Sequence, residues 1–187
     1  MKNTMILVSG MPATGKTSFA SWLSQTLHSP LVCYDHIKEK VLEIMHQSCK
    51  DPAQHHLFST MPYNLFWFNV EAMMKSSTVF IAEYFFTNQM VDTLQSLTSQ
   101  YQYETITVHM DTSAEFAYER FQERNLHTAT AQGLRPMDIS FEQFVNGTKQ
   151  NKDFRYGSRL IHVDTGDFSS VSYDNILSKI KEYSQEV

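Results

Sequence analysis

The chain has 187 residues, a formal net charge of −5 and a hydrophobic share of 42%, which together fit one globular domain over residues 1–187. No stretch is dense in Lys or Arg, so duplex nucleic acids are not expected as partners. The first apolar run ends at Gly10 and Pro12. It is too short for a signal peptide or a membrane span, and we therefore expect a cytoplasmic protein without a membrane partner. Nothing in the sequence specifies an oligomeric state.

Short apolar runs alternate with segments of helical periodicity along the chain. Strands are expected at 4–9, 31–34, 78–83, 105–110 and 160–163. Helices are expected at 17–27, 36–46, 88–97, 113–124, 141–152 and 173–183. Another helical segment follows the break at residues 50–52 and reaches about residue 75, with an interruption at Met61 and Pro62. The stretch 125–138 is polar, lacks apolar periodicity and holds Gly133 and Pro136, so we expect a mobile loop there.

Five buried strands that alternate with helices predict the fold class. They indicate an α/β domain in three layers, with a five-stranded parallel sheet covered by helices on both faces. Ligands of such sheets bind beyond the carboxyl ends of the strands. The loops that begin at Gly10, Asp35, Glu83 and Asp111 should therefore share one rim, and function is expected at that rim.

The first of these loops satisfies the phosphate-loop pattern G-x-x-x-x-G-K-[ST]. Its glycines let backbone N–H groups surround phosphate oxygens, Lys16 reaches the outer phosphates, and Thr17 offers a hydroxyl to Mg²⁺. A glycine-rich turn that binds nothing is the alternative, but Lys16 at a helix N-terminus opposes the helix dipole unless an anion is present. ATP and Mg²⁺ are therefore the expected cofactors. The candidate nucleotide-binding residues are Gly10, Met11, Pro12, Ala13, Thr14, Gly15, Lys16, Thr17 and Ser18.

Two acids end the next strands of the predicted sheet. Asp35 follows the second strand, where it could accept the proton of an attacking hydroxyl or orient that hydroxyl. It could equally cap the helix expected to begin at His36. Glu83 ends the third strand, where it could hold water on the magnesium ion or polarise an acceptor hydroxyl. Its alternative is a strand-end carboxylate that pairs with a neighbouring cation.

Two arginines, Arg120 and Arg124, lie four residues apart on one predicted helix face. They could stack on adenine or neutralise the charge of a transferring phosphoryl group, and on that account they join Lys16 and Asp35 as candidate catalytic residues. Surface pairing with a nearby acid is the alternative. The available acids are Glu115, Glu119 and Glu123.

Together these residues resemble the adenylate-kinase-like group of P-loop kinases, particularly small bacterial kinases similar to chloramphenicol phosphotransferase, gluconate kinase and polynucleotide kinase. The matching segments are 6–17, Asp35, the pair Arg120 and Arg124, and 162–165. The resemblance implies that Asp35 is the base, that the two arginines belong to a lid helix and that a short lid covers about 125–138. It also implies a small-molecule acceptor bound by the segment between the second and third strands.

The chain departs from this group at several positions. Glu83 stands where many relatives have Asp, Lys38 stands where an arginine often follows the base, and Arg135 is the only arginine in the lid segment. So few arginines disfavour a second nucleotide as acceptor, although Arg155 and Arg159 could contribute. Tyr84 lies at the rim and could line the acceptor pocket. The candidate substrate-binding residues are Asp35, Lys38, Glu83, Tyr84 and Arg135.

The sequence thus predicts a kinase that transfers the γ-phosphate of MgATP to a hydroxyl of a small molecule. The aromatic and methionine side chains between residues 55 and 74 suit an acceptor with apolar bulk, or they are core residues at helical spacing. The alternative function is a regulatory or toxin-like ATPase without a small-molecule acceptor. The candidate base and the paired arginines favour the enzyme.

Overall fold

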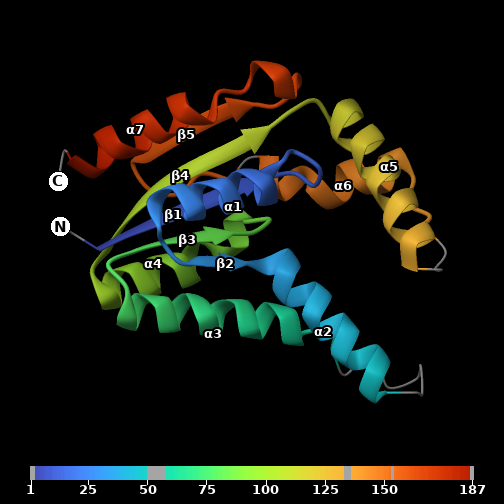
Figure 1. The fold of residues 1–187 in the computed structure, drawn as a ribbon, viewed down its shortest axis with the longest axis horizontal. Helices are drawn as coiled ribbons and strands as arrows, with labels where there is room; N and C mark the ends of the chain where they lie inside the picture. The colour runs from blue at the N-terminus through green and yellow to red at the C-terminus, as the bar shows by residue number, and fades with distance from the viewer. Residues whose placement is uncertain (1–2, 50–57, 133–135, 153, 186–187) are drawn as a thin grey trace.

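The computed structural model describes residues 3–49, 58–132, 136–152 and 154–185. Its centre is a sheet of five parallel strands in the order β2-β3-β1-β4-β5 (Figure 1). The predicted fold class and the number of strands are therefore confirmed. The strands are β1 (Asn3–Gly10), β2 (Leu31–Cys33), β3 (Val79–Glu83), β4 (Tyr103–Asp111) and β5 (Arg159–Asp164).

Helices connect the strands and follow the predicted order. The helices are α1 (Lys16–Leu27), α2 (Tyr34–Ser48), α3 (Met61–Ser76), α4 (Val91–Tyr101), α5 (Ala114–Gln132), α6 (Phe141–Lys152) and α7 (Tyr173–Gln185), with short 3₁₀ turns η2 (Asn88–Met90) and η3 (Phe168–Ser170). The predicted interruption at residues 61 and 62 is the start of α3. Pro62 occupies its first turn, where the missing N–H costs no hydrogen bond.

The sheet separates two cores because strand side chains alternate between its faces. One core joins strand residues such as Val8 and Val108 to α1 and α7, through Phe19 and Ile180 among others. The other joins the opposite strand residues to α3 and α4, and Phe66 and Leu94 belong to it. Figure 1 shows α7 and α3 on opposite sides of the sheet. Burial on both faces explains why the strands appear in the sequence as continuous apolar runs.

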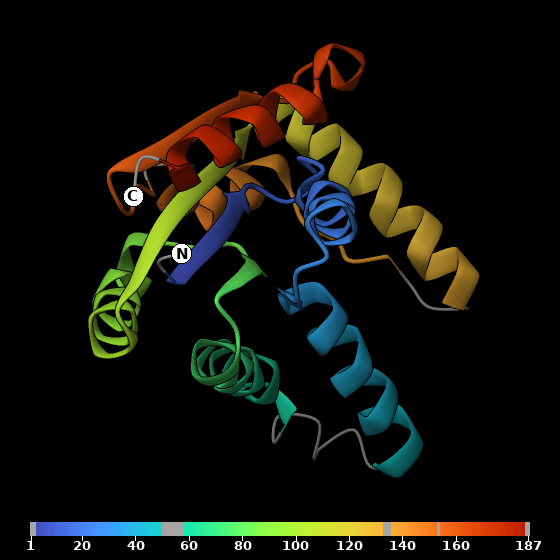
Figure 2. The same cartoon turned by 60° about the vertical axis from the view of Figure 1, so that its left-hand side comes forward.

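Helix α5 corrects the loop prediction for residues 125–138. The helix continues to Gln132, so the first eight residues of the expected loop are helical. The segment has good helix formers and no glycine or proline before Gly133. It lacks apolar periodicity because this end of the helix extends away from the sheet (Figure 2). Residues 133–135, which include Arg135, lie outside the described residues.

Two helices extend beyond the carboxyl ends of the strands. Figures 1 and 2 show α2 and α5 projecting from this rim in the same general direction. Helix α2 starts directly after β2, and α5 starts soon after β4, which places them on opposite sides of β1. Within the described ranges, no helix combines the length and apolar character that a membrane crossing needs.

Candidate functional site

The phosphate loop between β1 and α1 adopts a backbone that needs its glycines. Gly10 has φ +146°, and a Cβ there would lie 1.9 Å from the Met110 carbonyl oxygen. Gly15 has φ +81°, and a Cβ there would lie 2.8 Å from the Phe168 ring. Ala13 is also left-handed, with φ +63°. Such alternation of backbone hand turns successive N–H groups toward one concavity, and no side chain caps the start of α1.

Side chains inside the loop hold its shape. Both the Thr14 hydroxyl and the Lys16 ammonium donate to the Met11 carbonyl oxygen, each over 2.8 Å. The Met11 side chain is buried against Ala117 and Phe144, from α5 and α6. The Thr14 hydroxyl therefore stabilises the loop through Met11. Thr14 would bind a phosphate through its backbone N–H group.

Glu83 links the ends of β2 and β3 to the start of α1 beneath the loop. Its carboxylate Oε2 accepts from the Cys33 thiol over 2.9 Å and lies 3.5 Å from the donating Thr17 hydroxyl. The side chain is only 1% exposed. The neighbouring strands β2 and β3 are paired in register, with Cys33 opposite Glu83, which explains the first contact. None of the ion pairs among the described residues joins Glu83 to Lys16. The alternative interpretation, in which Glu83 only forms an ion pair with a neighbouring cation, therefore does not describe its contacts.

Burial and opposite charges act against each other at this centre. Burial lowers the pKa of Lys16, and the negative charges of Glu83 and Asp35 oppose that shift. Burial raises the pKa of Glu83, and the charge of Lys16 opposes it. Loss of water therefore disfavours the charged forms of Lys16 and Glu83, whereas the attraction between their opposite charges favours them. An anion with a metal ion would add the further partners that buried charges need.

Asp35 lies in the first turn of α2 rather than at its cap. The helix begins at Tyr34 and its cap residue is Cys33, so the interpretation of Asp35 as an N-cap is wrong. The helix starts earlier because the chain turns directly out of β2. The half-buried Asp35 carboxylate is close enough to affect the pKa of both Lys16 and Glu83. Lys38 is exposed one turn further along α2.

Arg120 and Arg124 have different surroundings. The two terminal nitrogens of Arg120 donate to the carbonyl oxygens of Thr165 and Gly166, each over 2.7 Å. Its guanidinium lies 4.1 Å from the centre of the Phe168 ring. None of the ion pairs in the described ranges joins it to a carboxylate, so the surface-pairing alternative does not hold for Arg120. Arg124 is exposed, and its charge contributes to the lowered pKa of Lys16.

The loop after β5 closes the opposite side of the phosphate loop. Phe168 lies between Gly15 and Arg120, and a cavity of about 390 Å³ opens beside it. The cavity is lined by Gly15, Ser18, Phe168, Val171 and Tyr173. Phe168 was not identified from the sequence as a neighbour of the phosphate loop. The one available signal was its position shortly after the end of the fifth strand. Cys33 was also missed as a partner of Glu83, although it ends the strand before Asp35.

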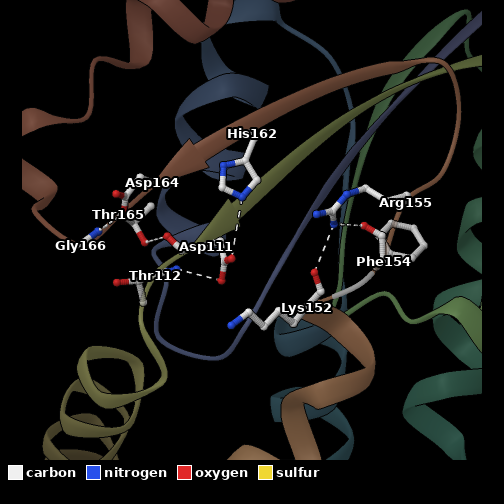
Figure 3. Close-up of polar contacts among 9 residues, drawn as sticks. All are labelled: Asp111, Thr112, Lys152, Phe154, Arg155, His162, Asp164, Thr165 and Gly166. Atoms are coloured by element: carbon white, nitrogen blue, oxygen red, sulfur yellow. Dashed lines mark hydrogen bonds and ion pairs between the residues drawn. The ribbon is translucent and has the colours of Figure 1, made fainter.

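The ends of β4 and β5 are fastened to each other (Figure 3). The Thr165 backbone N–H and hydroxyl both donate to the Asp111 carbonyl oxygen, over 2.7 and 2.9 Å. His162 Nε2 lies 3.8 Å from the Asp111 carboxylate. In the same view Arg155 donates to the carbonyl oxygens of Lys152 and Phe154. These contacts hold the loop that Arg120 binds.

Arg159 does not lie at the rim. It is the first residue of β5 and pairs with Glu104 at the start of β4, the opposite end of the sheet from the phosphate loop. The idea that it contributes to the acceptor site is therefore wrong.

Aromatic side chains surround Asp35 and the end of β3. The Tyr34 and Tyr84 rings lie 4.1 Å apart between centroids, and Phe66 lies 5.0 Å from Tyr84. Both tyrosines are half-buried against the core under α3. The structure thus packs Tyr84 against Tyr34, the residue before Asp35, and leaves both tyrosines partly exposed.

The residues at the rim fit a nucleoside triphosphate and its metal ion. The loop backbone and the uncapped start of α1 offer N–H donors to phosphate oxygens. The hydroxyl of Thr17 beside the Glu83 carboxylate is a donor set that Mg²⁺ and its waters accept. Lys16 could move from the Met11 carbonyl oxygen to a phosphate within reach.

Comparisons with known proteins agree with this geometry. The pattern of an AAA domain family matches residues 5–144. No match is found among curated protein sequences. A candidate kinase from Chloroflexus aurantiacus is 20% identical with a TM-score of 0.74, and the likeness covers 100% of this chain and 98% of that one.

Two characterised types of kinase have the same fold. A gluconokinase from Sinorhizobium meliloti is 14% identical with a TM-score of 0.54, over 95% of this chain and 89% of that one. A shikimate kinase from Bacteroides thetaiotaomicron is 13% identical with a TM-score of 0.55, over 97% and 98%. The resemblance to small P-loop kinases is therefore confirmed at the level of fold. Since the family pattern spans more than half of its length, the chain belongs to this AAA domain family, with a kinase-like P-loop fold.

Proposed function

We propose that the protein transfers the γ-phosphate of MgATP to a hydroxyl of a small molecule. One observation carries the proposal: Lys16, Thr17, Asp35 and Glu83 come from three different strand ends and act on one another at a single point of the rim. A loop that only bound nucleotide would not need a free carboxylate such as Asp35 at that point.

Each residue has a distinct proposed task. MgATP, when bound, supplies the phosphoryl group and much of the charge neutralisation. Asp35 accepts the proton of the acceptor hydroxyl from its place in the first turn of α2. Thr17 and Glu83 hold the metal side of the site, Glu83 through water. Lys16 and Arg124 add positive charge where negative charge develops.

The fold of the relatives supports the same class of reaction. The similar structures include a gluconokinase and a shikimate kinase, whose names describe phosphoryl transfer to small hydroxylated molecules. The positions of Asp35 and Glu83 favour this function over a regulatory ATPase, which would bind nucleotide without an acceptor base.

Release of ADP from MgATP, measured across panels of small alcohols, tests the proposal. Lys16→Ala should abolish any release that an acceptor stimulates. Asp35→Asn should lower kcat by about 10²- to 10⁴-fold, the usual contribution of a general base, while nucleotide affinity measured by calorimetry stays within a few-fold. Asp92→Asn is the matched control, because Asp92 is exposed on α4 and lies beside Trp67, Phe68 and Glu71 of α3.

The outcomes separate the two functions. Acceptor-stimulated release that depends on Lys16 and Asp35 supports the kinase. Nucleotide binding with no stimulated release by any acceptor would favour the regulatory ATPase. Full activity of Asp35→Asn would refute the assignment of the base.

A further inference from the structure

We infer that the acceptor is an electrically neutral alcohol with a flat apolar face, rather than a carboxylate or a phosphate ester. This inference rests on the proposed function, because it names the class of molecule that the same site would phosphorylate. Three features of the rim carry it: the side from which an acceptor must approach, the aromatic surface on that side, and the distribution of positive charge.

The sheet order fixes the side of approach. Strands β4 and β5 lie on one side of β1, and β3 and β2 lie on the other. On the β5 side are Phe168, Arg120 and the cavity beside Gly15, which suit the leaving nucleotide. In-line transfer requires the acceptor to attack from the opposite side. That side is formed by the ends of β2 and β3, where Asp35 lies.

An aromatic surface adjoins the candidate base there. Tyr34 directly precedes Asp35, and its ring packs against Tyr84 at 4.1 Å between centroids. Phe66 supports both rings from α3, at 6.1 and 5.0 Å. Tyr34 and Tyr84 are both half-buried and pack against the core under α3. Rings fixed in this way offer a flat apolar contact at little cost in conformational entropy.

Lysine and arginine are scarce in the described residues of α2 and α3. All five arginines of the chain lie between Arg120 and Arg159, so the segment from the phosphate loop to α5 has none. Lys40 is paired with Glu43 over 2.7 Å, and Lys75 with Glu71 over 2.9 Å. In the described part of α2 and α3, Lys38 is the one lysine without such a carboxylate partner.

A single exposed lysine is a weak receptor for an anion. Enzymes recognise carboxylates and phosphates mainly with arginine, whose planar fork makes two parallel hydrogen bonds. An anionic acceptor would also approach the negative charges of Asp35 and Glu83, which already act on each other. A carboxylate beside the aromatic surface would lose water without gaining a matching partner. A neutral hydroxyl compound meets neither obstacle.

The test compares acceptors that differ only in charge. Two matched pairs are para-(hydroxymethyl)benzamide with para-(hydroxymethyl)benzoate, and methyl shikimate with shikimate. Release of ADP from MgATP is measured for each, with Lys16→Ala as the blank. We expect kcat/KM for the neutral member to exceed that for the anionic member by about tenfold or more in every pair that reacts.

The result separates failure of this inference from failure of the proposed function. Preference for the anionic members would overturn the neutral class while leaving the kinase intact. No Lys16-dependent release with any member, although MgATP binds, would overturn the kinase and the acceptor class together. Preference for the neutral members supports both.

Variants of Tyr84 test the aromatic surface itself. With the best neutral acceptor, Tyr84→Ala should raise the acceptor KM by about tenfold through lost stacking, and Tyr84→Phe should restore it to within about threefold. The KM for ATP should not change in either variant, because the nucleotide lies on the other side of β1. An equal rise in both KM values would show general disruption of the rim and would count against the inference, as would an unchanged acceptor KM in Tyr84→Ala.

Discussion

The rim of the sheet holds two buried polar regions that differ in how their groups are satisfied. Around Glu83, at the end of β3, the polar groups contact one another. Its carboxylate receives the Cys33 thiol and lies beside the Thr17 hydroxyl, and the charge of Lys16 acts on it. Each contact joins segments that are distant in sequence.

Around His109, inside β4, the polar groups have no such contacts. His109 is 0% exposed, and neither ring nitrogen has a hydrogen-bond partner in the described part of the chain. Thr112 Oγ1 and Asn151 Oδ1 nearby are also buried without partners there. Asn151 does use its amide N–H group, which donates to Ser9 Oγ and to the Phe86 carbonyl oxygen.

We propose from this difference that the Glu83 carboxylate is held for chemistry, whereas the buried His109 ring mainly reduces stability. Buried charges around Glu83 are costly alone, and their mutual orientation toward the phosphate loop suits a charged ligand. The His109 ring lies 5.9 Å from the His162 ring, and burial lowers the pKa of His109 to about 4 although the charge of Asp111 opposes that shift. Substitution at Glu83 should therefore affect activity more than stability, and substitution at His109 should do the reverse.

Glu83→Gln should have the largest effect. The amide keeps the shape and an acceptor oxygen for Cys33 and Thr17, but it loses the charge that we propose holds water on a metal ion. We expect kcat/KM to fall by about 100-fold at limiting Mg²⁺, the upper range for a residue behind a metal site, with partial recovery at high Mg²⁺. The free energy of unfolding should change little, because the removal of one buried charge is offset by the loss of the main opposite charge beside Lys16.

The control for this variant is Glu104→Gln, at the other end of the sheet beside Arg159. It should leave kcat/KM within about twofold, since a substitution away from the site touches no reacting group. Activity unchanged in Glu83→Gln at every Mg²⁺ concentration would contradict a role at the metal side.

His109 should make the folded state sensitive to acid. Its folded pKa of about 4 lies below the ordinary value near 6.5, so between these two pH values the unfolded chain binds more protons than the folded one. Stability is therefore full above pH 6.5 and falls as the pH falls toward 4. From pH 7 to pH 5 this one group should cost about 2 kcal/mol of unfolding free energy.

Urea unfolding of His109→Phe at both pH values measures that cost. The variant should lose less stability on acidification than the wild type, by about 2 kcal/mol. His109→Leu is a second variant, since the phenyl ring is larger than imidazole and could overpack the site. His127→Gln, at an exposed position on α5, should keep the wild-type dependence. Equal acid sensitivity of all four proteins would show that other groups are responsible.

Sequence reasoning predicted the fold well because each strand is a short apolar run between helix signals. A parallel sheet brings its strand ends to one rim, so Asp35 and Glu83 could be assigned to the phosphate loop before the structure was known. Helix α5 was predicted too short because the segment beyond Arg124 has no apolar face, and helical propensity alone extends it to Gln132.

Side-chain contacts were harder to predict than positions. Arg120 was expected at the nucleotide, and in the structure it binds the Thr165 and Gly166 carbonyl oxygens and stacks on Phe168. Those contacts depend on how the loop after β5 folds back, which no periodicity encodes. The contact between Cys33 and Glu83 depends on the register of β2 against β3, and that register is also not visible in the sequence.

The Cys33 contact gives the smallest predicted effect and the closest test of the Glu83 region. Burial and the Glu83 charge raise the pKa of Cys33, so its thiol stays protonated and donates over 2.9 Å to Oε2. Cys33→Ala removes that donor and should lower the free energy of unfolding by about 1 kcal/mol. It should also weaken Mg²⁺-dependent activity several-fold, because Glu83 is less well oriented.

Cys33→Ser is the matched variant, because a hydroxyl of similar size can donate to the same oxygen. Cys33→Ser should therefore restore the Mg²⁺-dependent activity that is weakened in Cys33→Ala. If the donor matters only for packing, alanine and serine would instead give the same Mg²⁺ titration, and Glu83 would owe its orientation to Thr17 and Lys16 alone. The thiol would then resemble the groups around His109, buried at the rim without a part in its chemistry.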